Sequence, residues 1–260
     1  MTEPSNTYVV PLGVAPALPS FSNANTYLAV VSRDRYWLVD CADSPIGRLQ
    51  HAGLDPLNVQ GVIITHFHPD HVYGLPAYLM GLYLLSLKRG HPWQGPLHIY
   101  ARAEVLGLLQ AMIGLYQIQN WTEMFRVVYH VILSDLGASV AADQDFVISS
   151  APTHHSIPSL ALRFVQKESG HGFVYSSDTS PCPEVESLAW GAVLLFHEAS
   201  GAGYGHTDAA DAGSLAARAG VEHLVLIHYP PDRKAHLMAQ AQSTFKGKVD
   251  LAEAFTRYTW

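Results

Sequence analysis

Short apolar runs separated by polar turns recur along most of the chain, and this pattern predicts many buried strands. Two pairs of runs, 25–31 with 36–40 and 160–165 with 172–176, flank charged turns typical of hairpins. Further runs predict strands over 8–10, 96–100, 127–133, 146–148, 192–196, 224–227 and part of 249–260, and the segment 12–16 is expected to form a loop.

Apolar positions three and four residues apart predict helices over 45–52, 73–88, 103–118 and 236–245. Another helix is expected from a cap at Thr207 or Asp208 to Ala219, ending at Gly220. Twice along the chain, a series of strands gives way to alternating strands and helices. We therefore predict one α/β domain over residues 1–260, with two related halves, roughly 1–145 and 146–260. Two mixed sheets would pack face to face with helices outside.

A dense polar cluster, Thr65-His66-Phe67-His68-Pro69-Asp70-His71, directly follows the apolar run 61–64. Burying these side chains is costly unless something compensates for their lost hydration. A divalent metal does so, because imidazole and carboxylate are natural ligands of zinc and similar ions. His66 and His68 share a side of an extended segment and can hold one ion, while Asp70 and His71 can point to a second. The alternative, a surface loop that binds metal by accident, fits less well with the exit of a buried strand.

The composition favours a large buried core and gives no sign of a long nucleic acid as partner. Of the 260 residues, 48% are hydrophobic and 14% charged, and the formal net charge is −7. A basic stripe is missing. Cys41 and Cys182 lie far apart and do not indicate a disulfide framework. The N-terminus lacks the pattern of a signal peptide, and no segment has the length of a membrane span, so we expect a cytoplasmic protein.

Downstream, more candidate ligands appear at predicted strand ends. His154 and His155 follow one strand, Asp178 another and His228 a third. Each alone is an ordinary polar or turn residue. Taken together with the first cluster, they provide enough donors for two ions that share a bridging carboxylate.

These motifs resemble the metallo-β-lactamase superfamily, and within it the branch of ribonuclease Z and related phosphodiesterases. The resemblance runs nearly end to end, from the first predicted strand to residues 249–252. It is carried by Leu38-Val39-Asp40-Cys41, residues 64–71 with Gly74-Leu75-Pro76, His155-Ser156-Ile157-Pro158-Ser159-Leu160, Tyr175-Ser176-Ser177-Asp178-Thr179, Phe196-His197-Glu198-Ala199-Ser200 and Gly205-His206-Thr207.

The resemblance implies an αβ/βα four-layer sandwich with a dinuclear site between the sheets. It places His66, His68 and His155 on one metal, places Asp70, His71 and His228 on the other, and makes Asp178 the bridge. His154 competes with His155 for its role, and the Ser-Ile-Pro segment that follows favours His155. Asp40 would accept a hydrogen bond from a ligand imidazole and fix its tautomer. The ions would be zinc, with manganese or iron as alternatives.

The implied chemistry is hydrolysis of a phosphodiester by a metal-bridging hydroxide. His206, supported by Glu198, would give the leaving oxygen its proton, and Asp70 could hydrogen-bond the nucleophile as well as bind metal. For both members of the pair an ordinary role is also open, His206 as a first-turn helix residue and Glu198 as a buried paired carboxylate. A possible homodimer is implied by analogy only.

One departure bears on the substrate. Transfer-RNA-processing members of the branch carry a long arm between the third His ligand and the bridging Asp, and residues 155–178 have room only for a strand, a turn and a strand. We therefore expect a small-molecule or short phosphodiester substrate. One alternative is hydrolysis of another ester class, namely a lactone, thioester, sulfate ester or β-lactam. Another is tRNA 3′ processing despite the missing arm. A metal-dependent sensor or an iron redox protein would use the same ligands. The apolar segment 106–121 is read as a core-facing helix, or else as a cover for the site or a dimer face.

Overall fold

Two β-sheets form the centre of the molecule in the computed structural model, which describes residues 7–90, 93 and 95–260. Within these residues, the first sheet has six strands in the order β1-β2-β3-β4-β5-β6 and the second has seven in the order β13-β12-β11-β10-β9-β8-β7. The strands are β1 (Thr7–Gly13), β2 (Tyr27–Ser32), β3 (Arg35–Val39), β4 (Val59–Ile63), β5 (Leu97–Ala101), β6 (Val127–Val131), β7 (Ala138–Ala142), β8 (Phe146–Pro152), β9 (Leu160–Gln166), β10 (Gly172–Tyr175), β11 (Leu194–Glu198), β12 (His223–Ile227) and β13 (Lys248–Leu251).

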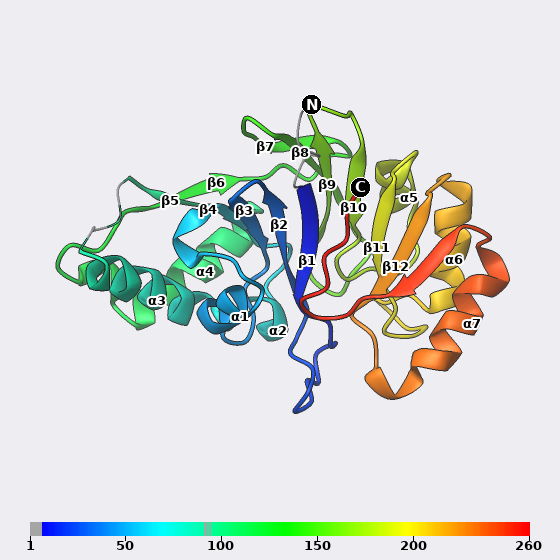
Figure 1. The fold of residues 1–260 in the computed structure, drawn as a ribbon, viewed down its shortest axis with the longest axis horizontal. Helices are drawn as coiled ribbons and strands as arrows, with labels where there is room; N and C mark the ends of the chain where they lie inside the picture. Colours follow the sequence, from blue (N-terminus) through cyan, green and yellow to red (C-terminus); the bar gives the residue numbers. More distant parts are fainter. Residues whose placement is uncertain (1–6, 91–92, 94) are drawn as a thin grey trace.

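Helices cover the outer faces of both sheets (Figure 1), α1 to α4 on the first and α5 to α7 on the second. The α-helices are α1 (Pro45–His51), α2 (Pro69–Val72), α3 (Leu75–Lys88), α4 (Ala103–Leu115), α5 (Pro183–Ala189), α6 (Ala209–Arg218) and α7 (Lys234–Thr244), and the 3-10 turns are η1 (Pro56–Asn58), η2 (Ile118–Asn120) and η3 (Pro231–Arg233). None of the helices in the described part of the chain is long and apolar enough to cross a bilayer.

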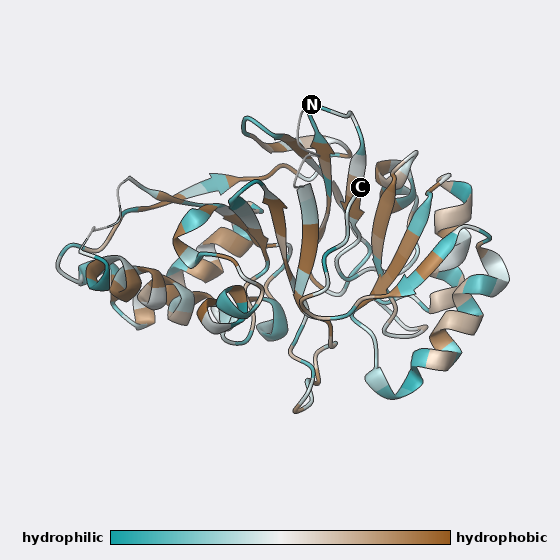
Figure 2. Cartoon of the chain, in the orientation of Figure 1, coloured by the Kyte–Doolittle hydropathy of each residue, from teal (hydrophilic) through white to brown (hydrophobic). Residues whose placement is uncertain are grey.

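The two sheets bury a common core between them. One continuous cluster joins Val30, Trp37 and Ile63 of the first sheet to Phe146 and Phe164 of the second. Many strands are apolar over much of their length, and the outer helices carry both apolar and polar residues (Figure 2). The prediction of two mixed sheets packed face to face is confirmed.

Both sheets change from antiparallel to parallel pairing, and this change positions the site. In the first sheet β1, β2 and β3 are antiparallel, and β3 to β6 are parallel. In the second, β7 to β10 are antiparallel and β10 to β13 parallel. Parallel strands bring their carboxyl ends to the same edge of a sheet, where ligands usually bind. The C-terminal tail returns to the first sheet, where Tyr258 pairs with Val9.

Most predicted elements are confirmed, including both hairpins and the cap of α6 at Asp208. The predicted helix 103–118 ends early, at Leu115, because Gln117 adopts a left-handed conformation with φ of 52°. The predicted loop 12–16 begins too early, since β1 pairs with β2 as far as Gly13. The division of the chain into two halves stays a prediction; among the described residues the first sheet ends at Val131 and the second begins at Ala138.

Candidate metal centre and active site

The polar residues singled out in the sequence lie at the carboxyl ends of strands from both sheets. Asp40 follows β3, and the cluster 65–71 follows β4 and enters α2. From the second sheet, His155 follows β8, Asp178 follows β10 and His228 follows β12. The site therefore forms where the two sheets meet.

Asp178 lies at the centre of the ligand cluster. One oxygen, Oδ2, is 3.8 Å from His66 Nε2, 3.6 Å from His71 Nε2 and 3.9 Å from His155 Nε2. The other, Oδ1, is 3.6 Å from His228 Nε2. A carboxylate that faces imidazoles on both sides has the geometry needed to bridge two cations.

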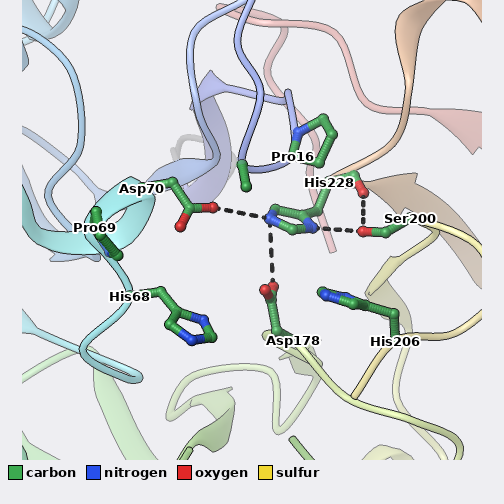
Figure 3. Close-up of a pocket in the computed structure, with 9 residues that line it drawn as sticks. Pro16, His68, Pro69, Asp70, Asp178, Ser200, His206 and His228 are labelled. Atoms are coloured by element: carbon green, nitrogen blue, oxygen red, sulfur yellow. Dashed lines mark hydrogen bonds and ion pairs between the residues drawn. The ribbon is translucent and has the colours of Figure 1, made fainter. Parts of the chain in front are cut away.

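The imidazoles fall into two groups around this carboxylate. His66, His68, His155 and Asp178 each offer one atom that lies within 4.8 Å of the others. Asp70, His71 and His228 form a second such group, which does not include Asp178. Asp70 Oδ2 is 3.5 Å from both His71 Nε2 and His228 Nε2. The close-up in Figure 3 shows His228 between Asp70 and Asp178, with His68 and His206 on either side of Asp178. These are the two ligand groups expected from the sequence.

Hydrogen bonds orient four of the imidazoles with Nε2 toward the site. His68 differs, because its Nδ1 lies 3.0 Å from His155 Nε2. His71 Nδ1 donates to Asp40 at 2.8 Å, and His155 Nδ1 donates to the carbonyl of Gly205 at 2.7 Å. His66 Nδ1 lies 3.0 Å from the hydroxyl of Thr65, which itself donates to Asp40. His228 Nδ1 lies 2.7 Å from Ser200 Oγ, which donates to the His228 carbonyl. Such outer contacts fix the tautomer that leaves the Nε2 lone pair available.

The residues present fit divalent cations. His66 Nε2, His71 Nε2, His228 Nε2 and Asp178 Oδ1 are buried without a hydrogen-bond partner. Leaving buried polar atoms unpaired costs about 1–3 kcal/mol each. Donors about 3.5 Å apart are also what ions with ligand bonds of about 2 Å require. A divalent metal would satisfy all four atoms.

The protonation of the cluster supports this assignment. Burial holds the pKa of His66, His68 and His155 below its ordinary value, so these imidazoles are neutral and ready to bind metal. Burial opposes ionisation of Asp178, but His228 and His71 hold its pKa well below its ordinary value. His71 is the exception, because Asp178 and Asp40 outweigh burial and raise its pKa.

His206 and Glu198 form a separate pair on the rim of the cluster. His206 Nδ1 donates to Glu198 Oε1 at 2.9 Å, and this hydrogen bond raises the pKa of His206. Glu198 is fully buried, whereas the His206 side chain is one-third exposed. His206 lines the same cavity as His68, Asp70, Asp178 and His228, which has a volume of about 300 Å³. A proton on His206 Nε2 would therefore lie beside the metal ligands.

Strained backbone surrounds the ligands. Asp40, Ser177 and His228 have φ of 60°, 53° and 52°, values that side chains with a Cβ adopt at a cost. Asp40 and His228 are residues of the site themselves, and Ser177 precedes Asp178. The surrounding contacts therefore hold these strand ends in place.

Other polar residues have different places. The His154 side chain is exposed and faces Glu184, not the cluster, which favours His155 as the ligand. His197 is buried beside the Glu198 carbonyl, and His223 pairs with Asp250. Tyr229 is buried and its hydroxyl donates to the carbonyl of Ala252, and Tyr204 lies outside the cavity lining.

Other residues that contribute to the site were not expected from the sequence. Thr65 connects Asp40 to His66, Ser200 orients His228, and Pro16 with Ala17 forms a wall of the cavity. Thr65 lies inside the conspicuous motif and could have been found there. Pro16 comes from the loop between β1 and β2, and only the packing of the two sheets brings it to the site.

A second, apolar cavity of about 450 Å³ adjoins the first and shares His68 with it. Phe67, Val105, Leu108, Ile157 and Pro158 line it, with Glu104 at one side. Glu104 is paired with Arg102. An apolar group attached to the reacting centre could be held here.

Comparison with known proteins agrees with this geometry. A family model described as anti-Pycsar protein Apyc1 matches residues 7–251. A protein named Ribonuclease Z from Methanothermobacter thermautotrophicus is 27% identical over 271 residues, covering 84% of each chain.

Solved structures show the same fold. The metallo-beta-lactamase fold protein YhfI from Bacillus subtilis superposes with a TM-score of 0.80 at 22% identity, covering 97% of this chain and 98% of the other. Human tRNase Z, short form (ELAC1), gives 0.78 at 23% identity over the same shares. The predictions of a metallo-β-lactamase fold, of similarity to the ribonuclease Z branch and of a metal-dependent hydrolase are confirmed.

Proposed function

The chain belongs to the family of the anti-Pycsar protein Apyc1, and within this family we propose that it acts as a dinuclear, metal-dependent phosphodiesterase. One ion would be held by His66, His68 and His155, and the other by Asp70, His71 and His228. Asp178 would bind both. Zinc is the first candidate, with manganese or iron as alternatives, since all three accept imidazole and carboxylate ligands.

The pairing of His206 with Glu198 is the observation that carries the proposal. Breaking a phosphodiester requires a proton for the leaving oxygen. His206 Nδ1 is occupied by Glu198 at 2.9 Å, so the imidazolium offers its Nε2 proton to the cavity. A hydrolase acting on a substrate with a good leaving group would have no need of such a donor.

The chain's own residues have distinct tasks in this reaction. When bound, two divalent cations supply Lewis acidity to the phosphoryl group and lower the pKa of water. Asp70 is ionised, because His228 and His71 outweigh the effect of burial on its pKa, and it can accept a hydrogen bond from the attacking water. His206 gives its proton to the leaving oxygen, and Glu198 stabilises the imidazolium before transfer.

The substrate is proposed to be a small or short phosphodiester. Between His155 and Asp178 the chain forms only β9, the turn 167–171 and β10, which leaves no arm to hold a folded RNA. The net charge of −7 also disfavours a long polyanion. Relatives named Ribonuclease Z weigh against excluding RNA, so a precursor tRNA belongs among the test substrates.

Turnover of a dinucleoside monophosphate, whose leaving alkoxide needs a proton, by zinc- or manganese-loaded protein tests the proposal. Bis(p-nitrophenyl) phosphate, whose leaving group needs none, is the comparison substrate and should be much less affected by loss of the donor. The variant His206→Ala should lower kcat/KM by about 10²–10⁴-fold at unchanged metal content, which is the usual contribution of a general acid. His171→Ala, at an exposed histidine, is the matched control. Absence of turnover with either metal, or an unimpaired His206→Ala variant, would show the proposal to be wrong.

The apolar cavity beside His68 favours a second candidate, hydrolysis of a hydrophobic ester of another class. Its lining would suit a neutral ligand such as a lactone or thioester, and a sulfate ester or β-lactam belongs in the same comparison. A panel of these esters, assayed on the same metal-loaded sample, decides between the candidates. Rates well above that of the phosphodiester would favour the second.

A further inference from the structure

We propose that His154, Cys182 and Glu184 form a third metal site, for a thiophilic divalent cation such as zinc. His154 follows β8, and Cys182 and Glu184 lie where the chain enters α5. Imidazole, thiolate and carboxylate are all zinc ligands, and three protein ligands leave a fourth position for water. The site is separate from the proposed hydrolytic centre and does not depend on it.

The spacing of the donors suits one ion. The ligand atoms of the three residues lie within 4.8 Å of one another, and His154 Nε2 is 3.5 Å from Glu184 Oε2. Around a tetrahedral zinc with ligand bonds of about 2.0–2.3 Å, neighbouring donors are about 3.5 Å apart. Small side-chain rotations would bring all three donors to a common centre.

Two of the donors lack adequate partners. Glu184 Oε2 is buried and has no hydrogen bond. Cys182 is 4% exposed, and its sulfur is 3.5 Å from the hydroxyl of Thr179. That hydroxyl already donates to Ser180, so the thiol must keep its own proton to interact with it. A cation would replace that proton and pair the orphaned carboxylate oxygen.

Charge and exposure agree with this assignment. One thiolate, one carboxylate and one neutral imidazole carry a charge of −2, which cancels that of the ion. The His154 side chain is 56% exposed, so the ion has a route from solvent and room for a water ligand. An ion pair between His154 and Glu184 would partner Glu184 Oε2 but would leave the buried thiol of Cys182 without a role.

The site would join the two segments that carry hydrolytic ligands. His154 precedes His155, and Cys182 lies on the segment that begins at Asp178. The two segments already touch, because Ser180 N donates to the His154 carbonyl at 2.8 Å. An ion at this point would clamp them together from the outer side of the centre.

Cobalt substitution tests the proposal, because only a thiolate ligand gives a cobalt site a near-ultraviolet sulfur-to-metal charge-transfer band. Protein loaded with excess Co²⁺ should show this band. Cys182→Ser should lose it, whereas Cys41→Ser, at the other buried cysteine, should keep it. His154→Ala, a substitution at an exposed position, should weaken or abolish the band. His171→Ala is its matched control.

Metal content gives a second reading on the same samples. Wild-type protein should hold one more zinc ion per chain than His154→Ala or Cys182→Ser. If the wild type shows no charge-transfer band, or if the band and the extra ion survive in both variants, the proposal is overturned. Neither result depends on phosphodiester turnover. A failure of the third metal site can therefore be distinguished from a failure of the proposed function.

Discussion

Glu198 is a fully buried carboxylate whose charge is surrounded by donors. Oε1 accepts from the amides of Thr179 and Thr207 as well as from His206 Nδ1, and Oε2 accepts from the amide of Ser200. These N–H groups take the place of water around the buried carboxylate. Glu198 Oε1 accepts from His206 Nδ1 at 2.9 Å, and this hydrogen bond raises the pKa of His206.

The first prediction concerns pH. His206 acts as an acid only below its raised pKa, so kcat/KM should fall as pH rises through that value. Glu198→Gln removes the charge, lowers the pKa of His206 and should move this basic limb to lower pH, as pH–rate profiles would show. The variant should also lose about 1–3 kcal/mol of stability, because an amide N–H would face the amide of Ser200. Glu168→Gln, at an exposed position, is the control, and an unmoved limb would contradict the pairing.

A second prediction concerns Asp40, which is fully buried. It accepts hydrogen bonds from His71 Nδ1 and from the amide and hydroxyl of Thr65. Asp40→Asn removes the charge and places an N–H₂ group where two acceptor oxygens are needed. Zinc affinity should fall about 10–100-fold, as for other groups that orient metal-binding imidazoles. Competition with a chelator of known affinity measures this. Asp135→Asn, exposed and distant, should bind zinc like the wild type.

At the scale of elements, the loop between β11 and α6 holds a ligand through its backbone. Gly205 has φ of 84°, and its carbonyl accepts from His155 Nδ1. A Cβ at this position would lie 2.7 Å from that same nitrogen and 3.3 Å from the amide of Ser156. Only glycine therefore allows the loop to approach His155 closely enough to fix its ring.

The third prediction follows from this contact. Gly205→Ala should lower the free energy of unfolding by about 1–3 kcal/mol, from backbone strain and overpacking together, and should weaken zinc binding by displacing His155. Gly220→Ala has a similar φ of 64° but nothing near its Cβ, so it isolates the strain and should leave zinc binding unchanged. Chemical denaturation and zinc titration of both variants measure the difference. Equal zinc affinities would contradict the proposed role of the loop.

The elements that the sequence did not reveal have identifiable causes. β7, with the sequence Ala-Ser-Val-Ala-Ala, has little apolar bulk and is a strand because it pairs with β8. α5 is short and begins at Pro183, so its apolar spacing spans barely two turns. By contrast, β11 and β12 are buried on both faces, and continuous apolar runs identify such strands. Local patterns thus predicted the interior strands, whereas the edge strand β7 depends on its pairing with β8.

Across the whole molecule, the site depends on two sheets from distant parts of the chain. The cluster at the strand ends could be predicted because its side chains are too polar for their surroundings unless a partner such as a metal is bound. Its role in binding metal stays a prediction. Contacts between loops could not, since Pro16, Ser200 and Gly205 reach the site only through the packing of one sheet against the other. The homodimer, the single domain and the cytoplasmic location stay predictions.

The final prediction concerns metal removal, because the ions would connect His66 and His71 of the first sheet to His155, Asp178 and His228 of the second. Saturation at about 100 times the dissociation constant stabilises the native state by about 2.7 kcal/mol for each ion. Two ions would therefore raise Tm by roughly 10–20 °C for a chain of this size. Calorimetry of zinc-loaded and chelator-treated protein measures this. In the metal-free protein Asp178 and Asp40 raise the pKa of His71 above its ordinary 6.5.

The sign of the pH dependence follows from that shift. Protonated His71 stabilises the metal-free protein fully below pH 6.5, and this contribution is lost as pH rises through the raised pKa. Zinc must displace the same proton to bind Nε2. The difference in Tm between loaded and metal-free protein should therefore widen as pH rises from 6 to 8. A constant or shrinking difference would mean that His71 does not bind the metal.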